Sequence, residues 1–260
     1  MGKQRPTIVH MISSPVRSAP REVMYRIVDA IDRDSFQPAV AFLRRGLDEA
    51  EDFGFGDMLA DFEALDVPVY VGSMERKYQL HDATLLDRFL RDVGAKLLVS
   101  HLPRADLWAT AMAWWGRCHN VRLLHGAWEW WYAHTDPDDI PRPSGTAIET
   151  LDRILLRYTD RIACVSPATL ASLRDEQNIP EAKLVWMRTG IDVERYRVAD
   201  AAFADDRPVT FGMVTRVIES KGVFEFLDAI AAVQKRHPHT RALIAGDGPD
   251  LDRAKAHEDE

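Results

Sequence analysis

Short apolar segments alternate with amphipathic segments along most of the chain. The apolar segments are rich in Val, Ile and Leu, and they predict strands at Thr7–Ile12, Ala39–Leu43, Val67–Val71, Lys96–Ser100, Val121–Leu124, Arg161–Val165, Lys183–Met187, Val209–Val214 and Arg241–Ala245. Between them, apolar residues recur three and four positions apart, which predicts helices at Pro20–Ile31, Asp57–Leu65, Leu80–Val93, Asp106–Arg117, Thr146–Tyr158, Pro167–Gln177 and Gly222–Arg236. Because alternating strands and helices build parallel sheets covered on both faces, the sequence predicts an α/β fold.

The composition changes near Val198–Arg207 to Ala, Asp and Arg, which is typical of a linker. We therefore expect a Rossmann-like domain over residues 1–195, a linker over 196–206 and an incomplete second Rossmann-like domain over 207–260. Such a remnant should expose apolar surface from Val209–Val214 and Phe224–Leu227. Dimerisation, docking on the first domain or poor solubility would follow, and Ala254–Glu260 is expected to be a frayed end.

The net charge of −8 argues against nucleic acid as a partner, since neutralising phosphates requires clustered Lys and Arg. Cys118 and Cys164 are interpreted as two buried thiols in a reducing cytosol, with a disulfide left open. The apolar run Ile8–Ile12 is too short for a signal peptide, and Leu107–Trp115 is far below the ~20 residues that span a bilayer. We expect a cytoplasmic protein, with contact to the inner face of the membrane left open.

Polar, basic and glycine residues collect after the predicted strands, where open parallel sheets bind ligands. These residues are Ser14, Arg17, His101, Arg104, His125, Gly126, Arg216, Lys221, Gly246, Asp247, Gly248 and Pro249. Arg216 and Lys221 flank a predicted helix N-terminus, where two cations and free backbone N–H groups suit a diphosphate. Two solvated surface cations are the alternative, and it remains open.

The His125-Gly126 step combines a side chain that can donate a hydrogen bond or shift protons with a glycine that lets a ligand approach. A structural histidine is the alternative, and for His101 it is the favoured one. Trp128, Glu129 and the aromatic residues beside them predict a surface that stacks on sugars or lies at a lipid interface. A local hydrophobic cluster, with Glu129 as a solvated charge, remains open.

Two D-x-D sequences, Asp32–Asp34 and Asp136–Asp138, have the spacing of a metal-bridged diphosphate site. Neither follows a buried strand, and chance matches are expected among 41 acidic residues. No metal is therefore expected. The sequence also lacks the H-E-x-x-H, C-x-x-C, P-loop and G-x-G-x-x-G patterns.

Several of these segments, taken in order, resemble the family 4 retaining glycosyltransferases of the two-domain GT-B architecture. Ser100–Asp106 resembles the family's strand end and helix cap, and Leu124–Gly126 resembles its His-Gly step. Asp160–Ser166 and then Val185–Arg195, with Gly190-Ile191-Asp192, are similar to a further stretch of the family. The most specific match is Phe211–Gly222 followed by Ala245–Pro249, which resembles the opening of the donor domain almost residue by residue.

The resemblance implies transfer of a sugar with retained anomeric configuration and with no cofactor other than the nucleotide-diphosphate sugar as co-substrate. It implies that Arg216 and Lys221 bind the donor diphosphate, that His125 faces the transferred sugar and its developing charge, and that the Gly246–Pro249 turn lies near the nucleotide. The acceptor-side residues would be Ser14, Arg17, His101, Arg104, Gly126, Trp128 and Glu129. We thus expect a glycosyltransferase of the hexosyltransferase type, with a glycan or lipid-linked acceptor, acting in the synthesis of a cell-surface polysaccharide or glycoconjugate.

The chain departs from the family pattern in two places. Ser18-Ala19 stands where the family usually has a Gly-Gly pair. The family's E-x7-E segment, which contacts the donor sugar and ribose, does not follow Pro249 in this sequence. One open alternative is therefore a non-catalytic module that binds an acceptor or partner. Such a module would need a complementing second chain or would form a homodimer. A sugar-nucleotide epimerase of the same architecture is a third.

Overall fold

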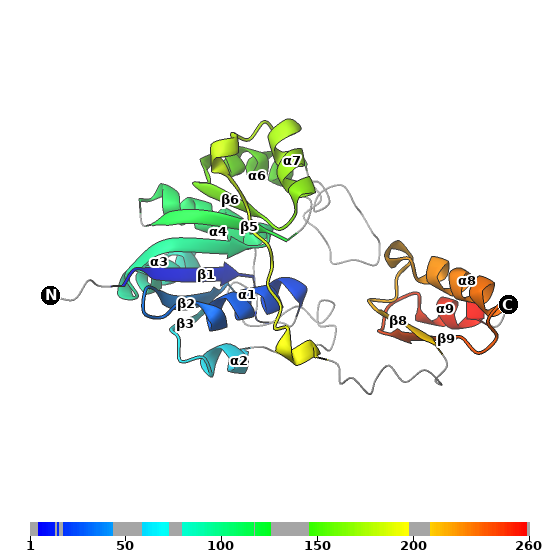
Figure 1. Cartoon of the computed structure of the whole chain (residues 1–260). Helices are drawn as coiled ribbons and strands as arrows, with labels where there is room; N and C mark the ends of the chain where they lie inside the picture. The colour runs from blue at the N-terminus through cyan, green and yellow to red at the C-terminus, as the bar shows by residue number, and fades with distance from the viewer. Residues whose placement is uncertain are drawn as a thin grey trace. The chain divides into compact units, whose positions relative to one another are not determined.

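The computed structural model describes residues 5–13, 15, 18–43, 59–72, 80–116, 118–125, 146–197 and 209–258. The chain divides into two compact units, unit 1 from Met1 to Ile191 and unit 2 from Asp192 to Glu260 (Figure 1). Most of the predicted linker lies outside the described residues, so its bounds stay a prediction. Each unit is described by itself.

Unit 1 is built on a seven-stranded parallel sheet with the order β3-β2-β1-β4-β5-β6-β7. Its strands are β1 Thr7–Ile12, β2 Gln37–Phe42, β3 Val69–Val71, β4 Ala95–His101, β5 His119–Leu124, β6 Arg161–Cys164 and β7 Leu184–Trp186. The predicted parallel α/β fold is confirmed. The order of connection reverses between β1 and β4, and the crevice outside the carboxyl ends of such a pair is where open α/β sheets bind ligands.

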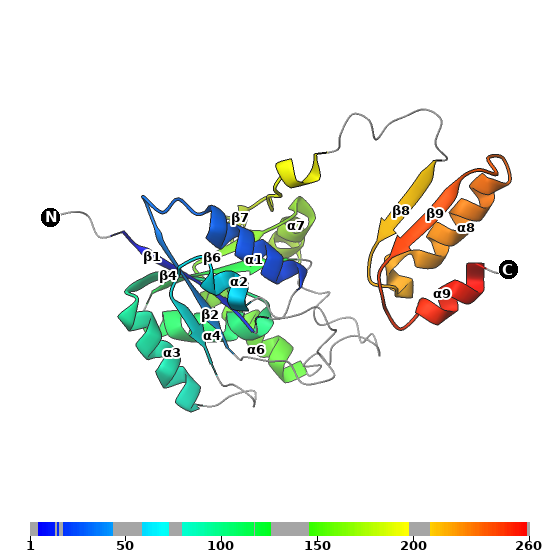
Figure 2. The ribbon, with the colours of Figure 1, turned by 90° about the horizontal axis from the view of Figure 1, so that it is seen from below.

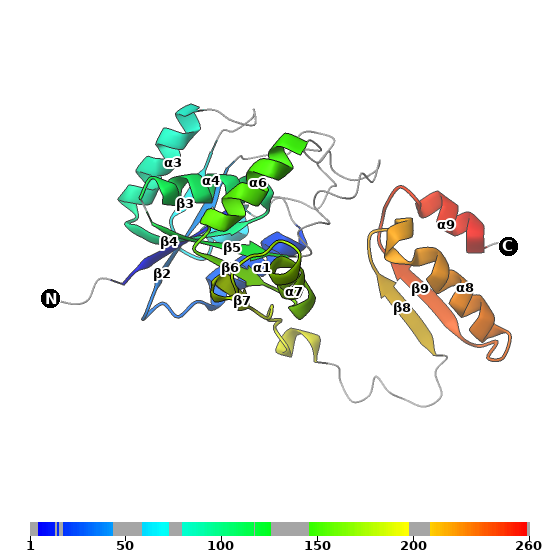
Figure 3. The ribbon, with the colours of Figure 1, turned by 90° about the horizontal axis from the view of Figure 1, so that it is seen from above.

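Helices cover both faces of this sheet, as Figures 2 and 3 show from opposite sides. They are α1 Ala19–Ala30, α2 Leu59–Glu63, α3 Leu80–Asp92, α4 Pro103–Trp114, α6 Thr146–Tyr158 and α7 Pro167–Asp175. Helices α3, α4 and α6 lie on one face, and α1 and α7 lie on the other. Among the described residues, no helix combines the length and apolarity needed to cross a bilayer.

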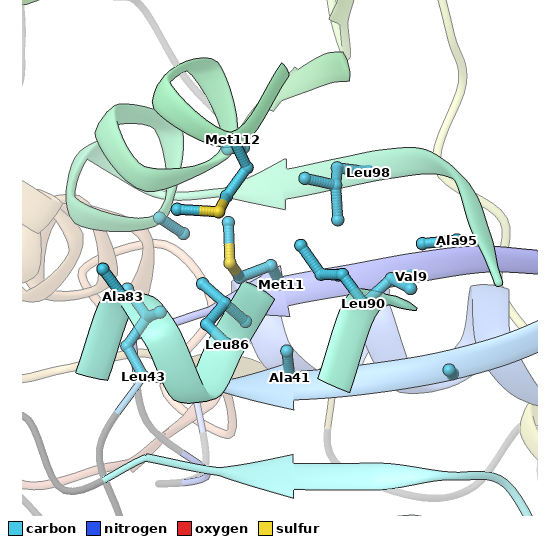
Figure 4. Packing of buried hydrophobic residues seen from close by; sticks show 13 residues of the cluster. Val9, Met11, Ala41, Leu43, Ala83, Leu86, Leu90, Ala95, Leu98 and Met112 are labelled. Carbon is cyan, nitrogen blue, oxygen red and sulfur yellow. The ribbon is translucent and has the colours of Figure 1, made fainter. Parts of the chain in front are cut away.

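The core of unit 1 follows from the alternation of side chains along its strands. Val9 and Met11 of β1 are fully buried and pack with Leu86 of α3 and Met112 of α4 (Figure 4). Ile12 points to the other face, where a second cluster gathers residues of α1, β2 and α2. The helices are thus held on the sheet by apolar clusters on both faces, and a third cluster packs Leu156 of α6 and Leu173 of α7 on β6.

A pair of backbone-to-side-chain hydrogen bonds joins the start of β5 to the start of β6. The backbone N–H of Asn120 donates to Oδ2 of Asp160 at 2.9 Å, and the backbone N–H of Asp160 donates to Oδ1 of Asn120 at 3.0 Å. Each residue therefore satisfies the other's main chain across 40 positions of sequence. This reciprocal pair, the Asn120–Asp160 clamp, closes the base of the long excursion between the two strands.

Local sequence signals predict some element ends and miss others. Ser166 caps α7, with its Oγ accepting a hydrogen bond from the backbone N–H of Thr169 at 3.1 Å. Helix α4 begins at Pro103 rather than at Asp106, because the proline occupies its first turn. The cysteines are free thiols, with Cys164 buried as predicted and Cys118 only half-buried.

Unit 2 contains a parallel pair of strands, β8 Thr210–Val214 and β9 Arg241–Ala245, with helices α8 Val223–Gln234 and α9 Leu251–Glu258. Two short 3-10 turns, Glu194–Tyr196 and Glu219–Lys221, also belong to it. Val209 and Val214 are exposed, as the sequence predicts. Phe224 and Leu227, where the sequence predicts exposed apolar surface, are half-buried because they pack on a cluster around Val217 and Val223.

Helix α9 is the element that the sequence analysis missed. The prediction of a frayed end is wrong for the residues up to Glu258. Ala254 is buried in the apolar cluster of unit 2, and two flanking side chains contact α8. The Arg253 guanidinium lies 4.2 Å from the centre of the Phe224 ring, and the His257 ring meets the same phenyl group edge-on. Tertiary packing therefore stabilises a helix whose own sequence is polar.

Candidate functional site

Three neighbouring strands bring three histidines together at the switch point of the sheet. His10 lies on β1, His101 is the last residue of β4, and His125 follows β5. His10 alternates with Val9 and Met11, whose side chains face α3 and α4, so its ring lies on the opposite face. The structure thus joins the predicted His101 and His125 with a third ring that the sequence analysis did not single out.

The three imidazoles form a continuous hydrogen-bonded line. Nδ1 of His10 lies 3.1 Å from Nε2 of His101, and Nδ1 of His101 lies 2.9 Å from Nε2 of His125. The His101 and His125 rings are stacked with their centres 5.2 Å apart. We call this arrangement the histidine chain. Its outer end is the half-buried His125, at the carboxyl end of β5.

Burial keeps the histidine chain neutral. It lowers the pKa of His10 and that of His125 from 6.5 to about 4. The pKa of His101 falls well below its ordinary value, through burial first and then through repulsion from any charge on its two neighbours. At neutral pH all three rings therefore carry a single N–H each, and His125 is a neutral hydrogen-bonding group rather than a cation.

A buried polar network lies on the α4 side of the same strands. Arg122 of β5 and Asp152 of α6 form an ion pair of 2.6 Å, with both side chains at most 2% exposed. Nη2 of Arg122 also donates to Oγ1 of Thr110 at 3.3 Å. In α4, Asp106 accepts a 2.5 Å hydrogen bond from Oγ of Ser100, the residue before His101. The network holds α4 and α6 on the strands that carry the histidine chain.

Asp106 is the perturbed acid of this network. Burial raises its pKa from 3.8 to about 7. The Arg122 charge opposes that rise, the nearby Asp152 charge adds to it, and the hydrogen bond from Ser100 opposes it. The Arg122 guanidinium, which is paired with Asp152, thus does not offset the cost of burying a charge at Asp106.

The turn from β4 into α4 holds an unusual backbone conformation directly after His101. Leu102 has φ 77° and ψ 150°, a region that residues other than glycine rarely adopt. Such a conformation costs about 1–3 kcal/mol and persists only where the surroundings impose it. Arg104, predicted to lie on the acceptor side, follows in the first turn of α4 and is half-buried.

The other acceptor-side predictions fall on segments that the structure does not describe. Ser14, Arg17, Gly126, Trp128 and Glu129 lie outside the described residues, as does the Asp136–Asp138 sequence. The Ser18-Ala19 pair begins α1, with the Ser18 carbonyl accepting from the backbone N–H groups of Arg21 and Glu22.

The predicted diphosphate residues of unit 2 share the loop between β8 and α8. Arg216 is half-buried and Lys221 is exposed, and both follow the carboxyl end of β8. Gly222 takes the left-handed conformation, with φ 75°, that starts α8 after Lys221. The structure thus confirms the strand-to-helix placement of the two cations.

The Gly246–Pro249 turn packs directly against the loop of Arg216. A Cβ atom on Gly246 would lie 1.8 Å from the Thr215 carbonyl oxygen, and one on Gly248 would lie 2.2 Å from that of Val217. The backbone N–H of Val217 donates to the Asp247 carbonyl at 2.9 Å, fastening the two segments together. These glycines therefore have a packing role that holds in the absence of any ligand.

The remaining D-x-D sequence lies away from the carboxyl ends of the strands. Asp32 is in the turn before β2, and its carboxylate accepts hydrogen bonds from the Asp34 backbone and the Ser35 hydroxyl of the same turn. Within the described segments, no group of three His, Cys, Asp or Glu side chains is arranged to hold a metal ion. In the histidine chain, the facing nitrogens are engaged with one another.

Sequence reasoning missed His10 and the network of Arg122, Asp106 and Asp152. His10 stands out as a polar residue within the apolar strand Thr7–Ile12, but its partners are 91 residues away in the case of His101. Arg122 is likewise a lone charge in an apolar strand. A polar residue inside a predicted buried strand was the available signal, and pairing it required the strand order.

Comparisons with known proteins bear on both units. The family model described as Glycosyltransferase Family 4 matches residues 21–195. The crystal structure of HepE from Anabaena in complex with UDP and glucose is similar with a TM-score of 0.71 at 14% identity, over 98% of this chain and 65% of that one. A glycosyltransferase from Rickettsia africae gives 0.68 at 13% identity, over 98% and 64%.

The chain thus spans slightly less than two thirds of the length of these two structures. A UDP-GlcNAc 2-epimerase from Neisseria meningitidis bound to UDP-GlcNAc is less similar, with a TM-score of 0.52 at 12% identity, over 97% and 68%. No curated protein sequence matches the chain. The likenesses confirm the predicted GT-B type fold.

Proposed function

Since the chain belongs to glycosyltransferase family 4, we propose that it binds a nucleotide-diphosphate sugar in unit 2 and that its catalytic residue, His125 of unit 1, serves sugar transfer. The observation that carries the proposal is the pair of cations, Arg216 and Lys221, in the loop after β8. The neighbouring structure of HepE contains UDP and glucose, which supports a nucleotide sugar as the partner.

The chemistry of the loop suits the diphosphate of such a donor. Arg216 offers a planar guanidinium that can contact two phosphate oxygens, and Lys221 adds a second positive charge at the start of α8. The packed glycines at 246 and 248 fix the neighbouring turn, so the loop is already shaped before a ligand arrives. Asp247 and Pro249 of this turn would lie near the nucleotide.

His125 would contact the transferred sugar as a neutral group. Its lowered pKa keeps it uncharged near pH 7, so it offers a hydrogen bond without placing a positive charge beside a sugar that itself becomes positive during transfer. We propose transfer with retained anomeric configuration to a glycan or lipid-linked acceptor in cell-surface polysaccharide or glycoconjugate synthesis. The segment after His125, with Trp128 and Glu129, would select that acceptor.

Calorimetric titration of the chain with UDP and UDP-glucose tests donor binding. We expect Arg216→Ala to weaken binding about 10- to 100-fold, because a charge-assisted hydrogen bond is worth roughly 1.5–3 kcal/mol. Arg236→Ala is the matched control, since Arg236 is an exposed cation just beyond the other end of α8. Circular dichroism verifies that each variant is folded.

Three outcomes would overturn this proposal. Equal affinities of the Arg216→Ala and Arg236→Ala variants would exclude the loop as the diphosphate site. No heat of binding for the unchanged chain up to millimolar nucleotide would favour the alternative module, which binds an acceptor or partner and needs a second chain. Conversion of UDP-GlcNAc to its epimer without an acceptor would instead favour the epimerase alternative, for which the Neisseria structure is the relevant likeness.

An exposed aromatic surface on α4 and α6 supports a contact with the inner, cytoplasmic face of a membrane. Trp114 and Trp115 are 76% and 62% exposed at the end of α4, and the Trp114 ring lies 5.8 Å from that of Tyr158 on α6. Leu151 and Ile154 continue this surface along α6. Trp and Tyr favour the interface of a bilayer, and the exposed cations of the same helix complement anionic lipid headgroups.

Sedimentation with vesicles of phosphatidylglycerol and phosphatidylcholine tests this contact. We expect the chain to sediment with anionic vesicles, and the double variant Trp114→Ser, Trp115→Ser to remain in the supernatant. A double variant that sediments as the unchanged chain does would contradict the proposal. Dimerisation that disappears in the same variant would assign the surface to a second copy instead.

A further inference from the structure

The histidine chain holds two rings, those of His10 and His101, whose function the donor and acceptor chemistry does not require. His10 is 3% exposed and His101 is fully buried, so His125 is the ring of the histidine chain that a ligand can reach in the part of the protein that the structure describes. Polar groups buried this deeply cost free energy unless their hydrogen bonds are made. Here Nδ1 of His10 is bonded to His101, and both ring nitrogens of His101 are bonded to neighbouring histidines.

Neutral imidazoles in a line constrain one another. Each ring carries one N–H and one lone pair, and the two short N–N contacts each need one donor and one acceptor. Both contacts are satisfied only if the three rings share the same tautomer. With every proton on Nδ1, the line donates from His10 toward His125; with every proton on Nε2, it donates the opposite way. Any mixture places two protons or two lone pairs face to face.

We propose that His10 and His101 are positioning residues that hold His125 in the Nδ1–H tautomer, so that its outer nitrogen donates a hydrogen bond. In this direction of donation, Nδ1–H of His10 donates to Nε2 of His101, and Nδ1–H of His101 donates to Nε2 of His125. The choice of this direction of donation rests on the proposed function, in which neutral His125 offers a hydrogen bond to an oxygen of the transferred sugar.

This tautomer needs a structural cause. A free neutral imidazole prefers to carry its proton on Nε2, and the partner of one ring nitrogen decides where the proton lies in a protein. At His125, a donated hydrogen bond into Nε2 forces the proton onto Nδ1. That donation is available only while His101 keeps its own proton on Nδ1, which the donation from His10 enforces in turn.

Nuclear magnetic resonance of the chain labelled with 15N-histidine tests the proposal without any nucleotide. The ring 15N shifts distinguish the two neutral tautomers, and the signals of His125 are identified by their loss in His125→Gln. At pH 7.5 we expect His125 to be in the Nδ1–H form. His10→Phe removes the first donor and should return His125, two rings away, to mainly the Nε2–H form.

A conservative variant separates this role from simple packing. Asn in place of His10 sets an amide N–H near the position of Nδ1, so His10→Asn should restore the Nδ1–H signal of His125. His119→Phe is the control, because His119 is 82% exposed at the start of β5 and pairs with Asp160. It should leave the His125 signal unchanged.

An Nε2–H form of His125 in the unchanged chain would overturn the proposal directly, whether or not the His10 variants fold. A His125 signal that is the same in His10→Phe and in the unchanged chain would also overturn it. Because the measurement needs no nucleotide, failure of UDP binding in calorimetry would refute the donor site and leave the tautomer result standing.

Discussion

The free energy of unfolding of the Asp106→Asn variant, compared with that of the unchanged chain at the same pH, should increase as the pH rises. Between pH 3.8 and about 7, Asp106 carries a proton in the folded protein but has lost it in the unfolded chain. The contribution of this group to the free energy of unfolding therefore falls as the pH rises through that window. Asn carries no charge, so the variant lacks this loss, while its Oδ1 still accepts the hydrogen bond from Ser100.

The pKa difference sets the magnitude of the effect. A change from 3.8 to about 7 corresponds to at most about 4 kcal/mol, since each tenfold change in affinity for the proton is worth about 1.4 kcal/mol. The stability difference between variant and unchanged chain should therefore grow by up to that amount from pH 4 to pH 8. The loss of the Asp106 charge beside Arg122 is already contained in this figure.

Urea unfolding followed by tryptophan fluorescence measures the difference at each pH. All seven tryptophans precede Asp192, so the signal reports on unit 1 alone. Asp92→Asn removes a carboxylate from the exposed end of α3 and controls for the change in net charge. Parallel stability curves for Asp106→Asn and the unchanged chain between pH 4 and pH 8 would refute the reasoning.

Two further changes test the packing of each unit. Gly248→Ala should destabilise unit 2 by about 1–3 kcal/mol, because the added Cβ would clash with the Val217 carbonyl; Gly212→Ala, with open space around its Cβ, is the control. Hydrogen exchange at the backbone of Val217 measures the loss of stability. Equal exchange in both variants would contradict the role assigned to Gly248. Asp152→Ala should cost unit 1 about 3–5 kcal/mol by leaving Arg122 buried without its counter-ion, as judged by urea unfolding. Arg91→Ala breaks the ion pair of an exposed guanidinium with the half-buried Asp87 on α3 and should cost less than Asp152→Ala, and a similar loss in the two variants would refute the distinction.

Local patterns predict the elements of this chain well because the strands are predominantly apolar and most of the predicted helices carry an apolar stripe. They fail at α9, whose polar sequence becomes helical through contacts of Arg253 and His257 with α8. The candidate site divides in the same way. Arg216 and Lys221 are close in sequence and follow a predicted strand, so their place in one loop can be predicted from the sequence.

His10 and Arg122 could not be placed from the sequence, since their partners depend on the order of strands in the sheet. The pairing of β1 with β4, and of β4 with β5, sets His10, His101 and His125 side by side. Nothing in the spacing of these residues along the chain indicates it. A parallel sheet fixes such neighbours only after its topology is known.

The Asn120–Asp160 clamp separates the scaffold of unit 1 from the segment that would choose the acceptor. The strands on either side keep their register from Val121 opposite Arg161 to Leu124 opposite Cys164. Because the reciprocal bonds tie the strand starts directly, we expect the pairing of β5 with β6 to tolerate substitutions in residues 126–145. We therefore expect that exchanging residues 126–145 for those of another family member would leave this pairing in place, so that the proposed acceptor segment can be changed without rebuilding the strands that hold it.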